Sequence, residues 1–149
     1  ALKGAHGIFA SMTAKLTKAK KGKIYDVLER TGLLDQAFEK VSSLSHGQKQ
    51  WVEIAMVLAQ DPSVVLLDEP TAGMTAEETF ATGEIIKSIA KAHSIVVIEH
   101  DMEFVKQIAE RIVVLHQGAV LAEGSVQEIQ SNPKVIEVYL GRETINAAA

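Results

Sequence analysis

Three ionisable side chains follow two apolar runs of this sequence and could act together on one bound ligand. Asp68 and Glu69 come directly after the run at residues 64–67, and His100 comes shortly after the run at 95–98. A carboxylate at the end of a buried strand can hold Mg²⁺, usually through water. A second carboxylate can orient and deprotonate an attacking water. Helix capping or a solvated turn would explain either acid taken alone.

His100 also has a simple explanation, because a histidine at a strand end is often only hydrogen-bonded in place. Its position at the end of a neighbouring strand favours a functional role over this simple structural one. Parallel strands bring their carboxyl ends to one edge of an open sheet, where ligands bind. At that edge, His100 could contact a γ-phosphate and hold Glu69 in line. The remaining histidines show no metal-ligand spacing.

A further candidate lies at residues 44–48, which read Leu-Ser-His-Gly-Gln. Ser45 and Gln48 match a capping box at the start of a helix. A capping box does not explain Gly47, because glycine early in a helix costs about 1 kcal/mol relative to alanine. An anion site does explain it, since bare helix N–H groups bind anions and glycine lets a phosphate approach closely. Both interpretations can hold together.

The apolar pattern predicts helices from residue 1 to about 60. One stripe precedes Gly32, a short helix is expected at 35–40, and a longer helix ends at Asp61-Pro62. The two stripes are Ile24, Val27 and Leu28, and Trp51, Ile54, Ala55 and Leu58.

From about residue 63, strands are predicted to alternate with helices. The β-branched runs at 64–67 and 95–98 indicate two strands buried on both faces. Thr75 with Glu78, and then Asp101, are expected to cap the helices that follow them. The second of these helices has the apolar stripe Met102, Val105, Ile108 and Ala109. This alternation predicts an α/β fold with a parallel sheet.

The C-terminal part has its own turn and cap signals. Gln117-Gly118 predicts a tight hairpin turn between two short strands. Ser125 with Glu128 forms a further capping box, and Pro133 is expected to begin the last helix.

Composition excludes several classes of protein. The 149 residues include no cysteine, which rules out disulfides and thiolate metal sites, and no apolar run approaches the roughly 18 residues of a membrane span. The net charge of −4 argues against general nucleic-acid binding. A basic run has no interleaved aromatic residues, so we interpret it as a solvated face: Lys15, Lys18, Lys20, Lys21 and Lys23.

Together these motifs resemble the ATP-binding-cassette (ABC) ATPases. Residues 44–50 resemble the family signature LSGGQ, and residues 64–69 resemble its Walker B motif with the catalytic glutamate. Residues 72–75 fall at the D-loop, and His100 falls at the switch histidine. The details at His46, Trp51, 98–105 and 138–142 are most similar to the ATPase subunits of urea uptake systems, which are close to branched-chain amino acid transporters.

The resemblance implies a role for each motif in a head-to-tail pair of cassettes that sandwiches two ATP molecules. Asp68 would hold Mg²⁺ through water, Glu69 would be the general base, and His100 would fix the γ-phosphate and the water. The signature would contact the γ-phosphate bound by the partner subunit through Ser45, His46, Gly47 and Gln48. The D-loop would cross the dimer interface at Ala72, Gly73, Met74 and Thr75.

The resemblance also implies the fold: a partial P-loop NTPase core preceded by a helical subdomain. The helical signature subdomain would cover residues 1–62, the C-terminal part of the RecA-like core 63–142, and a tail 143–149. The sequence contains no G-x-x-x-x-G-K-[S/T] motif, since Gly22-Lys23 is followed by Ile24. We therefore expect a C-terminal portion of an ATPase, inactive alone, with the phosphate-binding loop upstream of Ala1.

The implied partners are a second ABC ATPase subunit, membrane permease subunits and, indirectly, a solute-binding protein, with no nucleic acid. The implied location is the cytoplasm, on the inner face of the cell membrane, and the implied process is ATP-driven uptake of urea or branched-chain amino acids. Two alternatives stay open: a non-transport ABC ATPase of DNA repair or translation, and an interaction module without catalysis.

Overall fold

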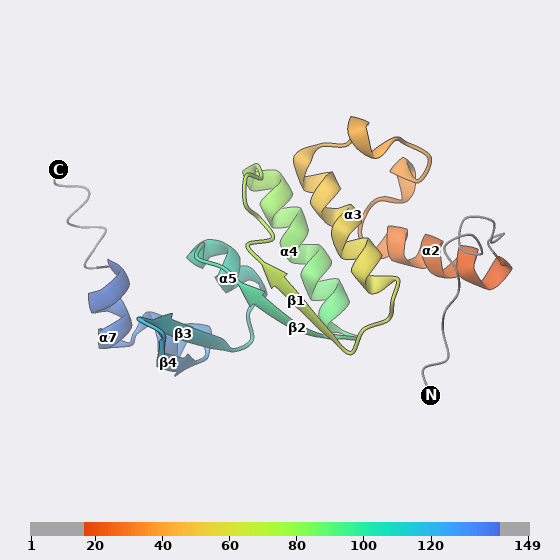
Figure 1. The fold of residues 1–149 in the computed structure, drawn as a ribbon. Helices are drawn as coiled ribbons and strands as arrows, with labels where there is room; N and C mark the ends of the chain where they lie inside the picture. The colour runs from red at the N-terminus through yellow and green to blue at the C-terminus, as the bar shows by residue number, and fades with distance from the viewer. Residues whose placement is uncertain (1–16, 141–149) are drawn as a thin grey trace.

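The computed structural model describes residues 17–140, and its first part is helical (Figure 1). Helix α2 (Lys18–Arg30) begins at the cap residue Thr17 and is followed by Gly32 at a φ of +69°. The lysines of the basic run that fall in this range are exposed on α2, whereas Lys15 lies outside the described residues. These exposed positions agree with a solvated face.

The short helix predicted at residues 35–40 is wrong. Two 3₁₀ turns, η1 (Leu34–Gln36) and η2 (Val41–Ser43), take its place. Phe38 between them is 91% exposed, so this segment buries no apolar face that could stabilise a helix of its own.

Helix α3 (His46–Leu58) carries the predicted apolar stripe, in which Ile54, Ala55 and Leu58 are buried. Its half-buried Trp51 donates a hydrogen bond of 2.8 Å from Nε1 to Oγ1 of Thr82 on the next helix, α4 (Ala76–Ala90). This contact fixes α3 beside α4, and the two helices run side by side in Figure 1.

Strands β1 (Val64–Asp68) and β2 (Ser94–Ile98) form the predicted parallel pair, in register from Val64 opposite Ser94 to Asp68 opposite Ile98. Helix α4 connects them. The core lies between this pair and the helices, and it consists of Val27, Ile54, Ala55, Leu58, Val65, Leu67, Ile85, Ile86, Ile89 and Phe104.

The prediction that both strands are buried on both faces is wrong for the described chain. Val65 is 2% exposed, but Leu66 is 75% exposed and Ile98 62%. Successive side chains of a strand point to opposite faces, and the described helices cover only one face of the pair. Figure 1 shows α3 and α4 on that one side.

Helix α5 (Met102–Ile108) is capped by Asp101 as predicted, but its apolar stripe differs. Phe104 is the buried anchor at 2% exposure, whereas Met102 is 41% exposed. Ala109 has already left the helical conformation, with a ψ of 131°, so the predicted stripe cannot continue to it.

The C-terminal part confirms the predicted hairpin and caps. Strands β3 (Ile112–His116) and β4 (Ala119–Gly124) pair antiparallel across Gln117 and Gly118, both with positive φ. Helix α6 (Val126–Gln130) has its capping box, and α7 (Pro133–Val135) continues into a π-helical turn, η3 (Ile136–Leu140). The predicted tail, 143–149, lies outside the described residues. Across 17–140, no helix is both long and apolar enough to traverse a bilayer.

Candidate functional site

The carboxyl ends of the two parallel strands bring the predicted acid and histidine together. Asp68 ends β1, and the Glu69 backbone N–H donates to the Ile98 carbonyl at 2.9 Å, which extends the strand pairing. His100 Nδ1 lies 3.5 Å from Glu69 Oε1. These two side chains therefore meet at one edge, although their catalytic roles stay predictions.

Glu69 has an unusual backbone, with a φ of +45°. Its carbonyl accepts from the Ala72 N–H at 3.1 Å, so the chain turns sharply directly after the strand. Non-glycine residues seldom adopt this left-handed region, and they keep it only where their surroundings hold them there. The surrounding contacts therefore hold the backbone of Glu69 in one conformation.

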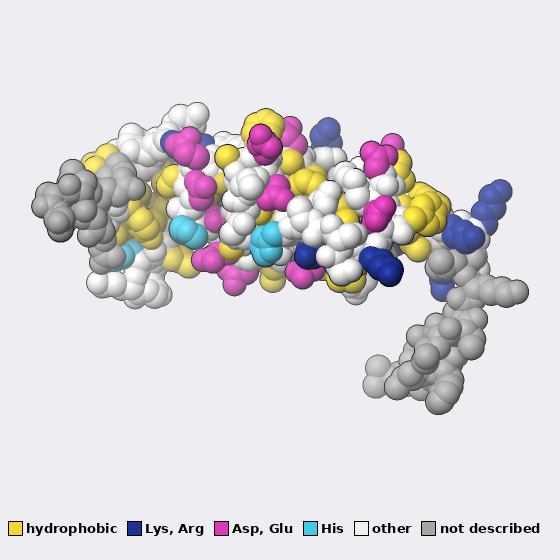
Figure 2. Space-filling model, turned by 90° about the horizontal axis from the view of Figure 1, so that it is seen from above, with side chains coloured by type: hydrophobic (Ala, Val, Ile, Leu, Met, Phe, Trp, Pro, Cys, Tyr) yellow, Lys and Arg dark blue, Asp and Glu magenta, His cyan; other side chains and the backbone are white. Residues whose placement is uncertain are grey.

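This edge is open to solvent. The side chain of His100 is 80% exposed and that of Glu69 56%. Acidic and histidine side chains lie near one another on the face seen in Figure 2. Within residues 17–140, no group of three or more acidic, histidine or cysteine side chains is placed to hold a metal ion. Asp68 suits Mg²⁺, which commonly takes one or two carboxylates together with waters and phosphates.

The start of α3 forms the predicted capping box. The Gln48 N–H donates to Ser45 Oγ at 3.2 Å, and the Ser45 N–H donates to Gln48 Oε1 at 3.0 Å. The Ser45 hydroxyl also donates to Oε1 of Glu78 at 2.7 Å, and the Gly47 N–H donates to the same oxygen at 3.3 Å. A carboxylate from α4 therefore occupies the anion position at this helix start.

The two carboxylate oxygens of Glu78 accept hydrogen bonds at the N-termini of two helices, α3 and α4. Its Oε2 accepts from the Thr75 N–H at 3.1 Å, which closes the predicted capping box of α4. The Ser45 hydroxyl, followed by the Thr75 N–H, holds the pKa of Glu78 below its ordinary value. The side chain is therefore an anion at neutral pH.

Gly47 has a packing reason that the sequence did not reveal. A Cβ at this position would lie 2.8 Å from both Cδ and Oε1 of Glu78. The missing side chain makes room for this carboxylate. Close approach of a phosphate, the reason expected from the sequence, stays a prediction.

The signature and the predicted D-loop touch each other within the chain. His46 Nε2 lies 3.1 Å from the Ala72 carbonyl oxygen. Gly73 has a φ of +72°, and a Cβ there would come within 3.4 Å of the same imidazole nitrogen. Thr82 Oγ1 lies 3.2 Å from Met74 Sδ, and Thr75 caps α4. Among the described residues, no hydrogen bond or ion pair joins the signature to Glu69 or His100.

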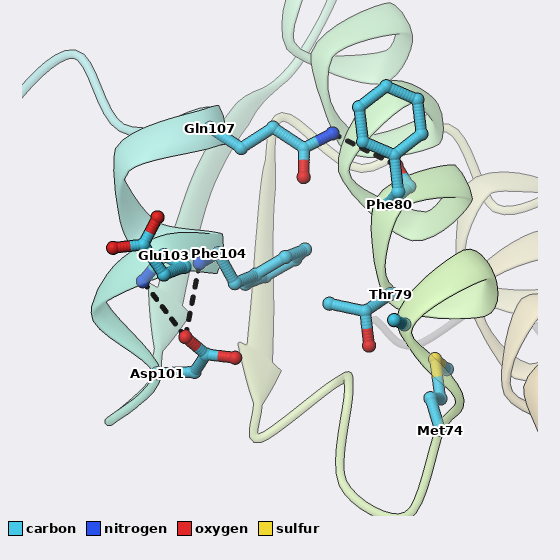
Figure 3. Close-up of a pocket in the computed structure, with 8 residues that line it drawn as sticks. Met74, Thr79, Phe80, Asp101, Glu103, Phe104 and Gln107 are labelled. Atoms are coloured by element: carbon cyan, nitrogen blue, oxygen red, sulfur yellow. Dashed lines mark hydrogen bonds between the residues drawn. The ribbon is translucent and has the colours of Figure 1, made fainter.

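A hollow of about 520 Å³ lies between α4 and α5, beside this edge (Figure 3). Met74 and Phe80 line one side, and Asp101 and Phe104 line the other. Asp101 Oδ1 already caps α5 by accepting from the N–H groups of Glu103 and Phe104. Neither Glu69 nor His100 lines this hollow, so we do not take it as the site.

Two family models match the chain in succession. One, described as ABC transporter, matches residues 2–72, and one described as branched-chain amino acid ATP-binding cassette transporter matches residues 119–144. The chain belongs to the ABC transporter ATP-binding family. The roles predicted for the individual motif residues stay predictions.

Curated relatives of this ABC chain include amino acid transport proteins. The high-affinity branched-chain amino acid transport ATP-binding protein LivG of Salmonella typhimurium is 43% identical over 116 residues, which are 76% of this chain and 46% of LivG. BraF of Pseudomonas aeruginosa is 40% identical over the same shares. The methionine import ATP-binding protein MetN of Streptococcus pneumoniae is 40% identical over 85% of this chain and 36% of MetN. The chain thus spans less than half the length of these relatives.

Solved ABC structures confirm the fold class. The ADP conformation of MJ1267, an ATP-binding cassette of an ABC transporter, matches with a TM-score of 0.73 and 27% identity, over 90% of this chain and 56% of that one. CbiO1 from Clostridium perfringens, part of an ABC transporter complex, matches with 0.69 and 27%, over 95% and 59%. The α/β arrangement is a partial ABC ATPase fold.

Sequence reasoning missed the contacts of two carboxylates at the candidate site. Glu78 was predicted only as a helix cap, because its contact with Ser45 depends on how α4 packs on α3. Glu99, which lies between the strand at 95–98 and His100, was given no role of its own. Its signal was available, since it continues the inward-facing alternation of Ile95 and Val97.

Proposed function

We propose that this chain is part of the ATP-binding subunit of an ABC importer, which hydrolyses ATP as a pair of cassettes and drives amino acid uptake. The observation that carries the proposal is the contact of 3.5 Å between Glu69 and His100, beside Asp68 at the carboxyl ends of two parallel strands. In this proposal, two independent strand ends bring a carboxylate for Mg²⁺, a general base and a γ-phosphate contact to a single edge.

Each residue of this edge has a role in the proposal. Asp68 holds Mg²⁺ through water, and the ion, when bound, neutralises charge on the phosphate oxygens. Glu69 orients the attacking water and takes its proton. His100 contacts the γ-phosphate and keeps the Glu69 carboxylate in line. The exposure of both side chains leaves room for a nucleotide at this edge.

The signature serves the opposite site of the pair in this proposal. Ser45, Gly47 and Gln48 face the γ-phosphate of the partner's nucleotide, with His46 beside them. The contact from His46 to the Ala72 carbonyl lets residues 72–75 relay a change between the two sites.

The relatives support the substrate class and partners. LivG, BraF and MetN carry amino acid transport names, so we favour amino acids, and urea finds no support among them. These relatives are transport proteins, which favours a transporter over a DNA-repair or translation factor.

The proposed partners are a second cassette, membrane permease subunits and a solute-binding protein. The location is the inner membrane face, and the domain boundaries stay as predicted: 1–62, 63–142 and 143–149.

The test uses the complete ATP-binding subunit that contains this sequence. Glu69→Gln should lower ATP turnover by about 10²–10⁴ while ATP binding persists, because a general base is removed and the side-chain shape is kept. Glu110→Gln is the matched control, since this exposed acid makes no side-chain hydrogen bond or ion pair with the described residues. Unchanged turnover in Glu69→Gln would remove Glu69 from the mechanism.

A further inference from the structure

Glu99 is a buried carboxylate that the proposed chemistry does not yet use. Its side chain is 2% exposed, although that of the adjacent His100 is 80% exposed. It directly follows β2 and continues the inward-facing side of that strand, where Ile95 and Val97 pack against the core. Burying a carboxylate is unfavourable unless hydrogen bonds replace its water. The partners of its two oxygens therefore indicate why it is there.

The two oxygens hold two different segments. Oε1 accepts from the Thr71 hydroxyl at 2.6 Å and from the Thr71 N–H at 3.3 Å. Oε2 accepts from the His100 N–H at 3.2 Å and lies 3.9 Å from His100 Nδ1. Thr71 belongs to the turn that follows β1, and His100 to the chain that follows β2. Glu99 thus ties together the two strand ends that form the candidate site.

The turn that contains Thr71 also sets the backbone of Glu69. The N–H of Glu69 is held by Ile98 and its carbonyl by Ala72, while its φ is +45°. A left-handed glutamate persists only when neighbouring contacts over-determine it. Glu99 supplies the side-chain contact that anchors this turn to β2, at Thr71.

We propose that Glu99 is a positioning residue for ATP hydrolysis: by holding Thr71 and the His100 backbone together, it fixes the placement of Glu69 relative to His100. The inference rests on the proposed function, in which Glu69 and His100 act on the nucleotide. In this inference Glu99 acts on the reaction only through Thr71 and His100. Its effect should therefore fall on the rate of the chemical step rather than on nucleotide binding.

The first variants, made in the complete ATP-binding subunit, separate the two sides of this link. Glu99→Gln keeps the shape and can still accept from Thr71, but its amide then places a donor opposite the His100 N–H. Thr71→Val removes the hydroxyl on the other side, and Thr71→Ser keeps it. We expect kcat to fall about 10- to 100-fold in Glu99→Gln and Thr71→Val, with KM for ATP within about twofold, because displaced catalytic groups lose rate steeply. Thr71→Ser and Glu110→Gln should stay near the parent.

A double-mutant cycle distinguishes positioning from simple stabilisation. If Glu99 acts through His100, Glu99→Gln should add less than about twofold in a His100→Ala background, because coupled residues are non-additive. A purely structural role would instead lower Tm, raise KM and lower kcat together. That joint pattern, or a kcat within about twofold of the parent in both Glu99→Gln and Thr71→Val, would overturn the inference.

Glu69→Gln, assayed in parallel, separates this inference from the proposed function. If Glu69→Gln is inactive and Glu99→Gln is normal, only the positioning role is wrong. If Glu69→Gln keeps the parent turnover, the proposed function is wrong and the positioning role falls with it. Loss of kcat in both, with KM and Tm preserved in Glu99→Gln, supports both proposals.

Discussion

His100 Nδ1 lies 3.5 Å from Glu69 Oε1, across the carboxyl ends of two parallel strands. The contact is long for a hydrogen bond, and it becomes an ion pair when the imidazole is protonated. Neither side chain is buried, so packing cannot hold the two side chains in position. Their positions must be set by the backbone. The left-handed Glu69 and the Glu99 link to Thr71 and His100 set these positions.

The contact between Ser45 and Glu78 can be measured directly in this chain. Ser45→Ala should raise the pKa of Glu78 toward its ordinary value, because the serine hydroxyl is the largest cause of its lowering. A pH titration of the Glu78 side-chain carbon by NMR measures this. Ser43→Ala is the control, since the Ser43 hydroxyl donates to the Lys40 carbonyl instead. An unchanged titration of Glu78 in Ser45→Ala would refute the contact.

Acid should destabilise the fold through three carboxylates that accept hydrogen bonds in the folded state. The pKa values of Glu78, Glu84 and Glu128 are all lowered, chiefly by hydrogen bonds from Ser45, Lys87 and Ser125 respectively. A lowered carboxyl pKa contributes stability at pH values above the ordinary pKa of 4.5, and this contribution is lost as pH falls through the folded pKa. Thermal melts by circular dichroism should show Tm falling below about pH 4. A constant Tm from neutral pH down to about pH 3 would contradict this.

The hydrogen bond from Trp51 to Thr82 should contribute to global stability. Thr82 is 0% exposed, so Thr82→Val leaves the indole N–H without its acceptor in a dry setting. We expect a loss of about 1–3 kcal/mol in the free energy of unfolding. Urea titration followed by the fluorescence of the single tryptophan measures it.

Thr79→Val is the matched control for this measurement. Thr79 lies on the same helix, and its hydroxyl makes no hydrogen bond with the described residues. Its change should stay within about 0.5 kcal/mol. Equal losses in both variants would show that the hydroxyl of Thr82 has no special role.

The open face of the β1–β2 pair should make the chain self-associate when it is produced alone. Leu66 is 75% exposed, and Val64, Val96 and Ile98 are each more than half exposed. Such an apolar sheet face favours association. Light scattering should therefore detect species larger than a monomer. Leu66→Lys should reduce them, whereas Met56→Lys, at an exposed apolar site on α3, should not. A clean monomer at micromolar concentration would contradict this prediction.

Local signals in the sequence predicted much of the fold. The capping boxes at Ser45, Thr75 and Ser125 have the predicted partners, because each bond joins residues within one helical turn. The edge of Glu69 and His100 was also predictable, since parallel strands place their ends together. Its chemistry still depends on the experiments described above.

Contacts between elements could not be predicted in this way. The packing of α3 on α4 brings Glu78 to Ser45, and no local spacing encodes that. Phe104 replaces Met102 as the anchor of α5 because the direction of the helix over the core decides which face is buried. The exposure of Leu66 depends on what covers the second sheet face, which a strand pattern alone does not specify.

Glu78 gives the start of α3 a resident negative charge. Its Oε1 already accepts hydrogen bonds from the Ser45 hydroxyl and the Gly47 N–H, so both donors are occupied. A phosphate oxygen arriving there would have to exchange with this carboxylate rather than fill a vacancy. Through Oε2, the displaced side chain could stay tethered to Thr75. Recognition at this helix would then be a substitution of one anion for another, with the incoming group competing against the protein's own.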